Sequence, residues 1–169
     1  MKPRRYTGTN DGIANGRRPG LTAFISEIEK LSGGALWNNG DFVVRNKRGK
    51  ESLSVHSTGR AVDMSWRHIR SIGKGSESRG VPNGRQAALM VCRVLVRNAD
   101  LLGVELVLDY FPEPHGRGWR CDRRDWIRYD IPTLGGAPGG DWLHIEITPE
   151  MADDPKKVRE SFSNLPPLN

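Results

Sequence analysis

Cysteine is scarce in this sequence, with Cys92 and Cys121 the only two in 169 residues. A single pair cannot supply the network of disulfides that stabilises many small secreted domains. Cys92 lies in an apolar helical stretch, which is typical of a small buried hydrophobic residue. We therefore expect both thiols to be reduced and the fold to rest on an ordinary hydrophobic core.

Long apolar runs are also missing. No stretch approaches the roughly 20 apolar residues that a transmembrane helix needs. The N-terminus, Met-Lys-Pro-Arg-Arg, is basic but is not followed by the apolar region of a secretory signal. We expect a protein made in a host cytoplasm without a membrane partner. If its substrate lies outside, another agent must release it.

The charge balance is basic, with a formal net charge of +6. Such a surface favours anionic partners such as nucleic acid or cell-wall polymers, although it can serve solubility alone. The densest basic patch suits a peptide carboxylate, a wall polymer or plain solvation, and comprises Arg117, Arg120, Arg123, Arg124 and Arg128.

Apolar spacing predicts an α+β domain. Helical periodicity spans residues 21–31 and 84–102, and a short polar helix follows residue 148. Strand patterns cover residues 41–45, 60–66, 104–108, 126–131 and 142–147. We expect a small antiparallel sheet with helices packed on one face and a metal cleft on the other. Residues 1–20 are predicted to form an irregular arm, and residues 21–165 a single domain.

Two of the predicted strands carry metal-binding groups on one side. Side chains alternate between the faces of a strand, so Asp63 lies opposite the apolar pair Val62 and Met64. By the same rule His144 and Glu146 share one face of residues 142–147. If the apolar faces of both strands pack into the core, Asp63 and His144 lie on one polar surface.

A second histidine can reach this surface. His56 precedes Asp63 by seven residues, and Gly59 between them permits a sharp turn. Ala61 is small and leaves room for an ion. Two imidazoles and a carboxylate form an open catalytic zinc site, with the fourth position left for water. A hydrogen-bonded structural His–Asp pair is the alternative interpretation.

The residues Ser54-x-His56-x-x-Gly59-x-Ala61-x-Asp63, followed by Asp141-x-x-His144, resemble the zinc D-alanyl-D-alanine peptidase family. That family includes vancomycin-resistance dipeptidases and phage endolysins that cut L-alanyl-D-glutamate bonds, and it shares its fold with the Hedgehog signalling domain. The resemblance covers about residues 21–150. It implies a Zn²⁺ ion held by His56, Asp63 and His144.

The resemblance also implies catalytic roles. The acidic residue three positions before the last histidine acts as general base, here Asp141, where the family often has glutamate. Glu146 is the rival base, and its alternative role is to hold a ligand imidazole. Arg45, upstream of the first histidine, is the candidate for stabilising an oxyanion. The aromatic residues Tyr110, Trp119 and Trp126 are candidates for cleft walls or for core packing.

The leading hypothesis is a monomeric zinc metallopeptidase that hydrolyses peptidoglycan stem or cross-link peptides, as the catalytic domain of a phage endolysin. The cleaved bond, of L-Ala-D-Glu or D-Ala type, is left open. One alternative is a wall-binding module that keeps zinc without catalysis. Another is a basic metal-dependent nucleic-acid protein, which we do not expect because no helix-turn-helix, zinc-finger or RNA-binding signature is present.

Overall fold

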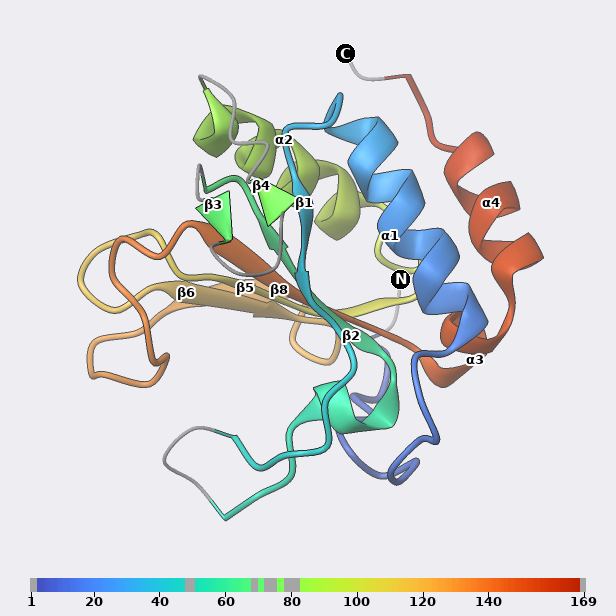
Figure 1. The fold of residues 1–169 in the computed structure, drawn as a ribbon, viewed down its shortest axis with the longest axis horizontal. Coiled ribbons are helices and arrows are strands. Elements are labelled where there is room, and N and C mark those ends of the chain that lie inside the picture. Colours follow the sequence, from blue (N-terminus) through green and yellow to red (C-terminus); the bar gives the residue numbers. More distant parts are fainter. Residues whose placement is uncertain (1–2, 48–50, 68–69, 72–75, 78–82, 168–169) are drawn as a thin grey trace.

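A six-stranded sheet organises the computed structural model, which describes residues 3–47, 51–67, 70–71, 76–77 and 83–167 (Figure 1). The strand order is β1-β2-β8-β5-β6-β7, and every neighbouring pair is antiparallel. The strands are β1 (Trp37–Gly40), β2 (Ala61–Ser65), β5 (Val104–Asp109), β6 (Arg117–Arg120), β7 (Asp125–Arg128) and β8 (Trp142–Ile147). A separate two-stranded ribbon consists of β3 (Arg70–Ser71) and β4 (Ser76–Glu77).

Helices complete an α+β fold. The described ranges hold four α-helices and one short 3-10 helix, namely α1 (Pro19–Leu31), α2 (Gly84–Arg97), α3 (Pro149–Asp153), α4 (Pro155–Ser163) and η1 (Val55–Thr58). Pro19, Pro149 and Pro155 begin three of them, where the missing N–H costs nothing. None of these helices is long and apolar enough to cross a membrane.

The hydrophobic core lies between one face of the sheet and the helices. Val62, Met64, Leu143 and Ile145 from β2 and β8 are fully buried there. They pack in one cluster with residues of α1, α2 and α4, including Phe24, Ile28, Val91, Leu95 and Phe162. Because strand side chains alternate, Asp63, His144 and Glu146 point to the opposite face. Figure 1 shows η1 and its flanking loops on that side of the sheet, away from α1 and α2.

Most of the predicted elements are confirmed. Residues 60–66 and 142–147 contain β2 and β8, residues 104–108 lie in β5, and residues 21–31 lie in α1. Residues 3–18 contain no helix or strand, as expected for the arm, but residues 19 and 20, predicted to belong to it, already form the start of α1. Both cysteines are buried and free. No helix or strand was predicted between residues 66 and 84, and most of this stretch lies outside the described residues; its described part includes β3 and β4.

The strand predicted at residues 41–45 is wrong. The edge strand is instead β1, four residues earlier, and its pairing with β2 becomes irregular between Asn38 and Gly40. The Asn38 side chain accepts the Gly40 N–H and donates to Asp41, so side-chain bonds replace strand pairing at this point. Val44, within this segment, is 54% exposed.

Two other predicted boundaries differ. Helix α2 ends at Arg97 rather than at residue 102. Turns connect it to Gly103, which has a positive φ of 61° and directly precedes β5. The strand predicted at residues 126–131 overlaps β7, which begins at Asp125 and ends at Arg128, and β7 forms a hairpin with β6, a strand that was not predicted. The sequence Arg-Gly-Trp-Arg of β6 shows no alternation of apolar and polar residues. Trp119 is its one large apolar side chain, and it is buried in the core.

Gly59 forms the turn that joins η1 to β2. Its φ is +69°, in the left-handed region, and a Cβ there would lie 2.6 Å from the carbonyl oxygen of Gly16. We predict that Gly59→Ala lowers the free energy of unfolding by about 2–4 kcal/mol, combining backbone strain with a steric clash. Urea denaturation measures this loss.

Gly12→Ala is the matched control. Gly12 also has a positive φ, of +79°, but no atom lies within 4 Å of the position of its Cβ. This variant should lose only the backbone contribution, about 1 kcal/mol. Equal losses in the two variants would show that the close approach at Gly59 does not matter.

Candidate metal centre

Three side chains from separate parts of the chain converge on the polar face of the sheet. Antiparallel pairing of β2 with β8 makes Asp63 and His144 direct partners. The 3-10 helix η1 and the turn at Gly59 bring His56 beside them, with the two imidazole centroids 4.9 Å apart. One ligand atom from each of the three lies within 4.8 Å of the others, and both imidazoles are buried.

The spacing of these atoms fits a tetrahedral ion. Asp63 Oδ1 lies 3.0 Å from His144 Nδ1 and 3.4 Å from His56 Nε2. Two ligands of one tetrahedral zinc ion, each bonded at about 2.0–2.1 Å, are separated by about 3.3 Å. The two distances from Asp63 are therefore close to the separation that a shared ion requires, and the third donor pair lies within 4.8 Å.

The remaining ring nitrogens have partners that select the right tautomer. His56 uses Nδ1 to hydrogen-bond the backbone carbonyl of Asp41. His144 uses Nε2 to hydrogen-bond Glu146 Oε1 at 2.9 Å. Both acceptors are oxygens, so in a metal-bound form these nitrogens carry the hydrogens. His56 Nε2 and His144 Nδ1 then keep their lone pairs for a cation.

The electrostatics of the group also favour a cation. Burial alone would raise the pKa of Asp63, but hydrogen bonds from His144 and His56 hold it well below its usual value. Burial alone would lower the pKa of His144, but its hydrogen bonds to Asp63 and Glu146 raise it to about 10. Without a metal, the two carboxylates thus hold a proton on His144. A divalent cation can take the place of that proton.

A cavity of about 610 Å³ opens over the three residues. One wall is aromatic, with Tyr110 stacked on Trp142 at a centroid distance of 4.5 Å. Among the described residues, the cationic side chains that line the cavity are Arg45, Lys47, Arg67 and Arg120. Arg67 is paired with Asp141 and Arg120 with Asp122. Within the described residues no ion pair involves Arg45 or Lys47, so the cavity carries positive charge beyond the metal ligands.

The predicted catalytic residues have different surroundings. Glu146 is buried beside the metal group and bonds both His144 and Tyr6. Arg45 lies at the cavity wall, and its side chain is exposed. Asp141 receives three hydrogen bonds from Arg67, at 2.6 to 2.9 Å. Among the described residues that line the cavity, Arg67 is present and Asp141 is absent.

The predicted basic patch is largely neutralised within the fold. Arg117 pairs with the buried Asp109, and Arg124 pairs with Asp100. Arg123 donates to the carbonyls of Gly118 and Asp125. Arg117 and Arg124 therefore connect the β6–β7 hairpin to neighbouring parts of the fold, and Arg123 bonds within the hairpin.

Sequence reasoning missed two side chains of the site. Tyr6, in the N-terminal arm, lines the cavity and donates to Glu146 across 140 positions of sequence. Arg67 lines the cavity and forms an ion pair with Asp141, which does not line it. Neither residue belongs to a periodic pattern or motif, so no local signal was present. Of the aromatic candidates, Tyr110 lines the cavity and Trp119 belongs to the core.

Comparison with models of protein families, with curated proteins and with solved structures found no match to this chain. The family resemblance therefore rests on the two motifs alone.

We predict that the protein binds one zinc ion per chain and that His144→Ala abolishes this binding. Because zinc must displace the proton on His144, the apparent affinity should fall about tenfold per pH unit as pH drops from about 8 to about 6. Calorimetry in buffers with different ionisation enthalpies measures the protons released. An affinity independent of pH would contradict the assignment of His144 as a ligand.

Proposed function

We propose that this chain is a zinc metallopeptidase that hydrolyses peptide bonds of bacterial peptidoglycan, as the catalytic domain of an endolysin. The observation that carries the proposal is the convergence of His56, Asp63 and His144 at the base of an open cavity. Three protein ligands with a side open to a cavity are typical of catalytic rather than structural zinc sites. We further propose that it acts as a monomer on the wall, after release from the cytoplasm.

Zinc is the proposed metal because the donors are two imidazole nitrogens and one carboxylate oxygen. Oxygen-only sites suit calcium and magnesium, whereas mixed nitrogen and oxygen donors suit zinc. Zinc bound here would lower the pKa of a coordinated water and polarise a substrate carbonyl. Glu146 and the Asp41 carbonyl would hold the two imidazoles in place.

The proposed substrate class follows from the motifs and the cavity. The pattern from Ser54 to Asp63 and the pair Asp141 and His144 resemble the zinc D-alanyl-D-alanine peptidases, and we propose the same fold for this chain. Helices on one face of an antiparallel sheet and the site on the other support that proposal. Stem peptides of the wall carry free carboxylates, which the cations Arg45 and Lys47 at the cavity can attract.

Asp141 is the proposed general base and Arg45 the proposed oxyanion stabiliser. Glu146 is buried, and it bonds His144, a proposed ligand, and Tyr6, which suits a positioning role. Asp141 also has both carboxylate oxygens bonded, by Arg67, but it is not buried. Asp141 has a side chain 33% exposed and is held by Arg67, itself a cavity residue. The Asp141 carboxylate would accept a proton from the attacking water and pass it to the leaving amine. Arg45 would balance the negative charge that develops on the carbonyl oxygen.

Digestion of purified peptidoglycan tests the proposed activity. We predict release of new amino groups, loss of this release on chelation, and recovery when zinc is added back. Mass spectrometry of the fragments identifies the bond that is cut. His144→Ala should be inactive. Wall binding and stoichiometric zinc without any released amino groups would contradict the enzyme and support the non-catalytic module.

Two isosteric variants separate the candidate bases. Asp141→Asn should keep its zinc but lose about 10²–10⁴-fold in kcat, the usual contribution of general acid–base catalysis. Glu146→Gln should instead weaken zinc binding about 10–100-fold, as expected for a partner of a ligand imidazole. Full activity of Asp141→Asn, with zinc-loaded Glu146→Gln inactive, would reverse the two roles.

A further inference from the structure

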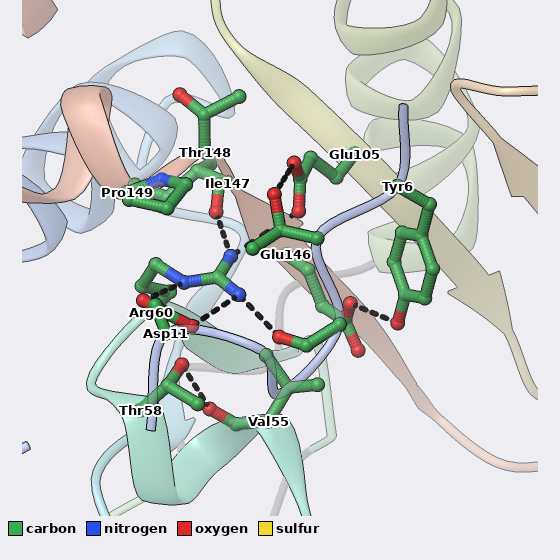
Figure 2. Close-up of polar contacts among 12 residues, drawn as sticks. Tyr6, Asp11, Val55, Thr58, Arg60, Glu105, Glu146, Ile147, Thr148 and Pro149 are labelled. Atoms are coloured by element: carbon green, nitrogen blue, oxygen red, sulfur yellow. Dashed lines mark hydrogen bonds and ion pairs between the residues drawn. The ribbon is translucent and has the colours of Figure 1, made fainter. Parts of the chain in front are cut away.

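The N-terminal arm reaches the metal centre through one side chain. Tyr6 donates its hydroxyl hydrogen to Glu146 Oε2 at 2.7 Å, and the other oxygen of Glu146 bonds His144 at 2.9 Å. Figure 2 shows the Tyr6 ring approaching Glu146 from the arm. Glu146 is only 3% exposed, so its two oxygens depend on these protein partners. A continuous chain of hydrogen bonds thus links the arm to the metal group.

The arm is anchored on both sides of Tyr6. Before it, Arg4 pairs with Asp100 at 2.8 Å and donates to the Ala99 carbonyl at 3.0 Å. Directly after it, Thr7 donates to the buried Glu105 at 2.6 Å. These contacts fix the backbone around Tyr6 without help from the Tyr6 hydroxyl.

Arg60 anchors the arm as well, and it lies between Gly59 and Ala61 in the stretch that carries His56 and Asp63. Its side chain is fully buried and bonds Asp11, at 2.8 and 3.1 Å, and the Gly8 carbonyl, both in the arm. It also contacts the Ile147 carbonyl at the end of β8 and Glu105 on β5 at 3.2 Å. Figure 2 shows this guanidinium group between the arm and the sheet. Arg60 therefore holds the arm against the strand that carries His144.

We propose that Tyr6 is a positioning residue of the metal centre. By holding the second oxygen of Glu146, it stops that carboxylate from rotating and so keeps the His144 ring aligned with Nδ1 beside Asp63. This inference rests on the proposed metal site. The two motifs include only residues 54–63 and 141–144, and the inference adds a residue of the N-terminal arm to them. Because Tyr6 acts through Glu146, its effect on the ion is indirect.

Zinc affinity and the cobalt spectrum of Tyr6→Phe test this inference. Partners that contact a ligand directly contribute about 10–100-fold to metal affinity, so a residue one bond farther should contribute about three- to tenfold. We expect weaker zinc binding by about that factor, measured by competition with a chromogenic chelator. We also expect a changed visible absorption spectrum of the Co²⁺-substituted protein, because the His144 ring is no longer held in one orientation.

Tyr129→Phe is the matched control. Tyr129 lines the same cavity, and its backbone N–H bonds the Gly116 carbonyl. The variant keeps this backbone bond and removes one tyrosine hydroxyl other than the one that bonds Glu146. Its zinc affinity and cobalt spectrum should equal those of the wild type. A double-mutant cycle of Tyr6→Phe with Glu146→Gln adds a second test. Tyr6→Phe should have a smaller effect on zinc affinity when Glu146 is already replaced.

The outcomes separate this inference from the proposed function. Wild-type protein that binds neither zinc nor cobalt would refute the metal site itself. Wild type that binds both, with Tyr6→Phe unchanged in affinity and spectrum, would overturn the role of Tyr6 alone. Additive effects in the cycle, or a loss of metal-free stability in Tyr6→Phe with no spectral change, would also overturn it by assigning Tyr6 a purely structural role.

Discussion

The pairing of β2 with β8 is the constraint on which the site depends. In this register Asp63 faces His144 directly, and the residues beside them, Val62 and Ile145, are paired in the core. A shift of one residue would turn the ligands into the core and the apolar side chains outward. The hydrophobic core therefore holds the candidate metal-binding residues in place, because the burial that stabilises the sheet also sets the register of its polar face.

Several ionisable side chains are buried at or near the polar face of the sheet. His144 lies between the carboxylates of Asp63 and Glu146, with Arg60 and Glu105 close behind. Buried ionic groups contribute little stability unless each is well paired, and breaking one pair is costly. In the described residues each of these groups has a partner. We infer that these paired charges orient the proposed metal ligands. We also infer that the N-terminal arm, which Arg60 bonds, contributes to that orientation.

Sequence patterns predicted the parts of the site that depend on local geometry. Strand alternation placed Asp63 and His144 on one face, and Gly59 marked the turn that brings in His56. Alternation failed at residues 41–45, because side-chain bonds of Asn38 end the edge strand earlier. The Arg67–Asp141 pair and the Tyr6–Glu146 bond could not be predicted, since they join residues 74 and 140 positions apart outside any repeating pattern. Such contacts arise only once the whole fold is assembled.

The central claim is that one zinc ion is shared by three side chains distant in the sequence. Crystals of the zinc-loaded protein, with diffraction data collected on both sides of the zinc absorption edge, test it most directly. The account predicts a single anomalous peak about 2.0–2.2 Å from His56 Nε2, Asp63 Oδ1 and His144 Nδ1. A fully occupied zinc peak elsewhere, with the three side chains bonded only to one another, would contradict it.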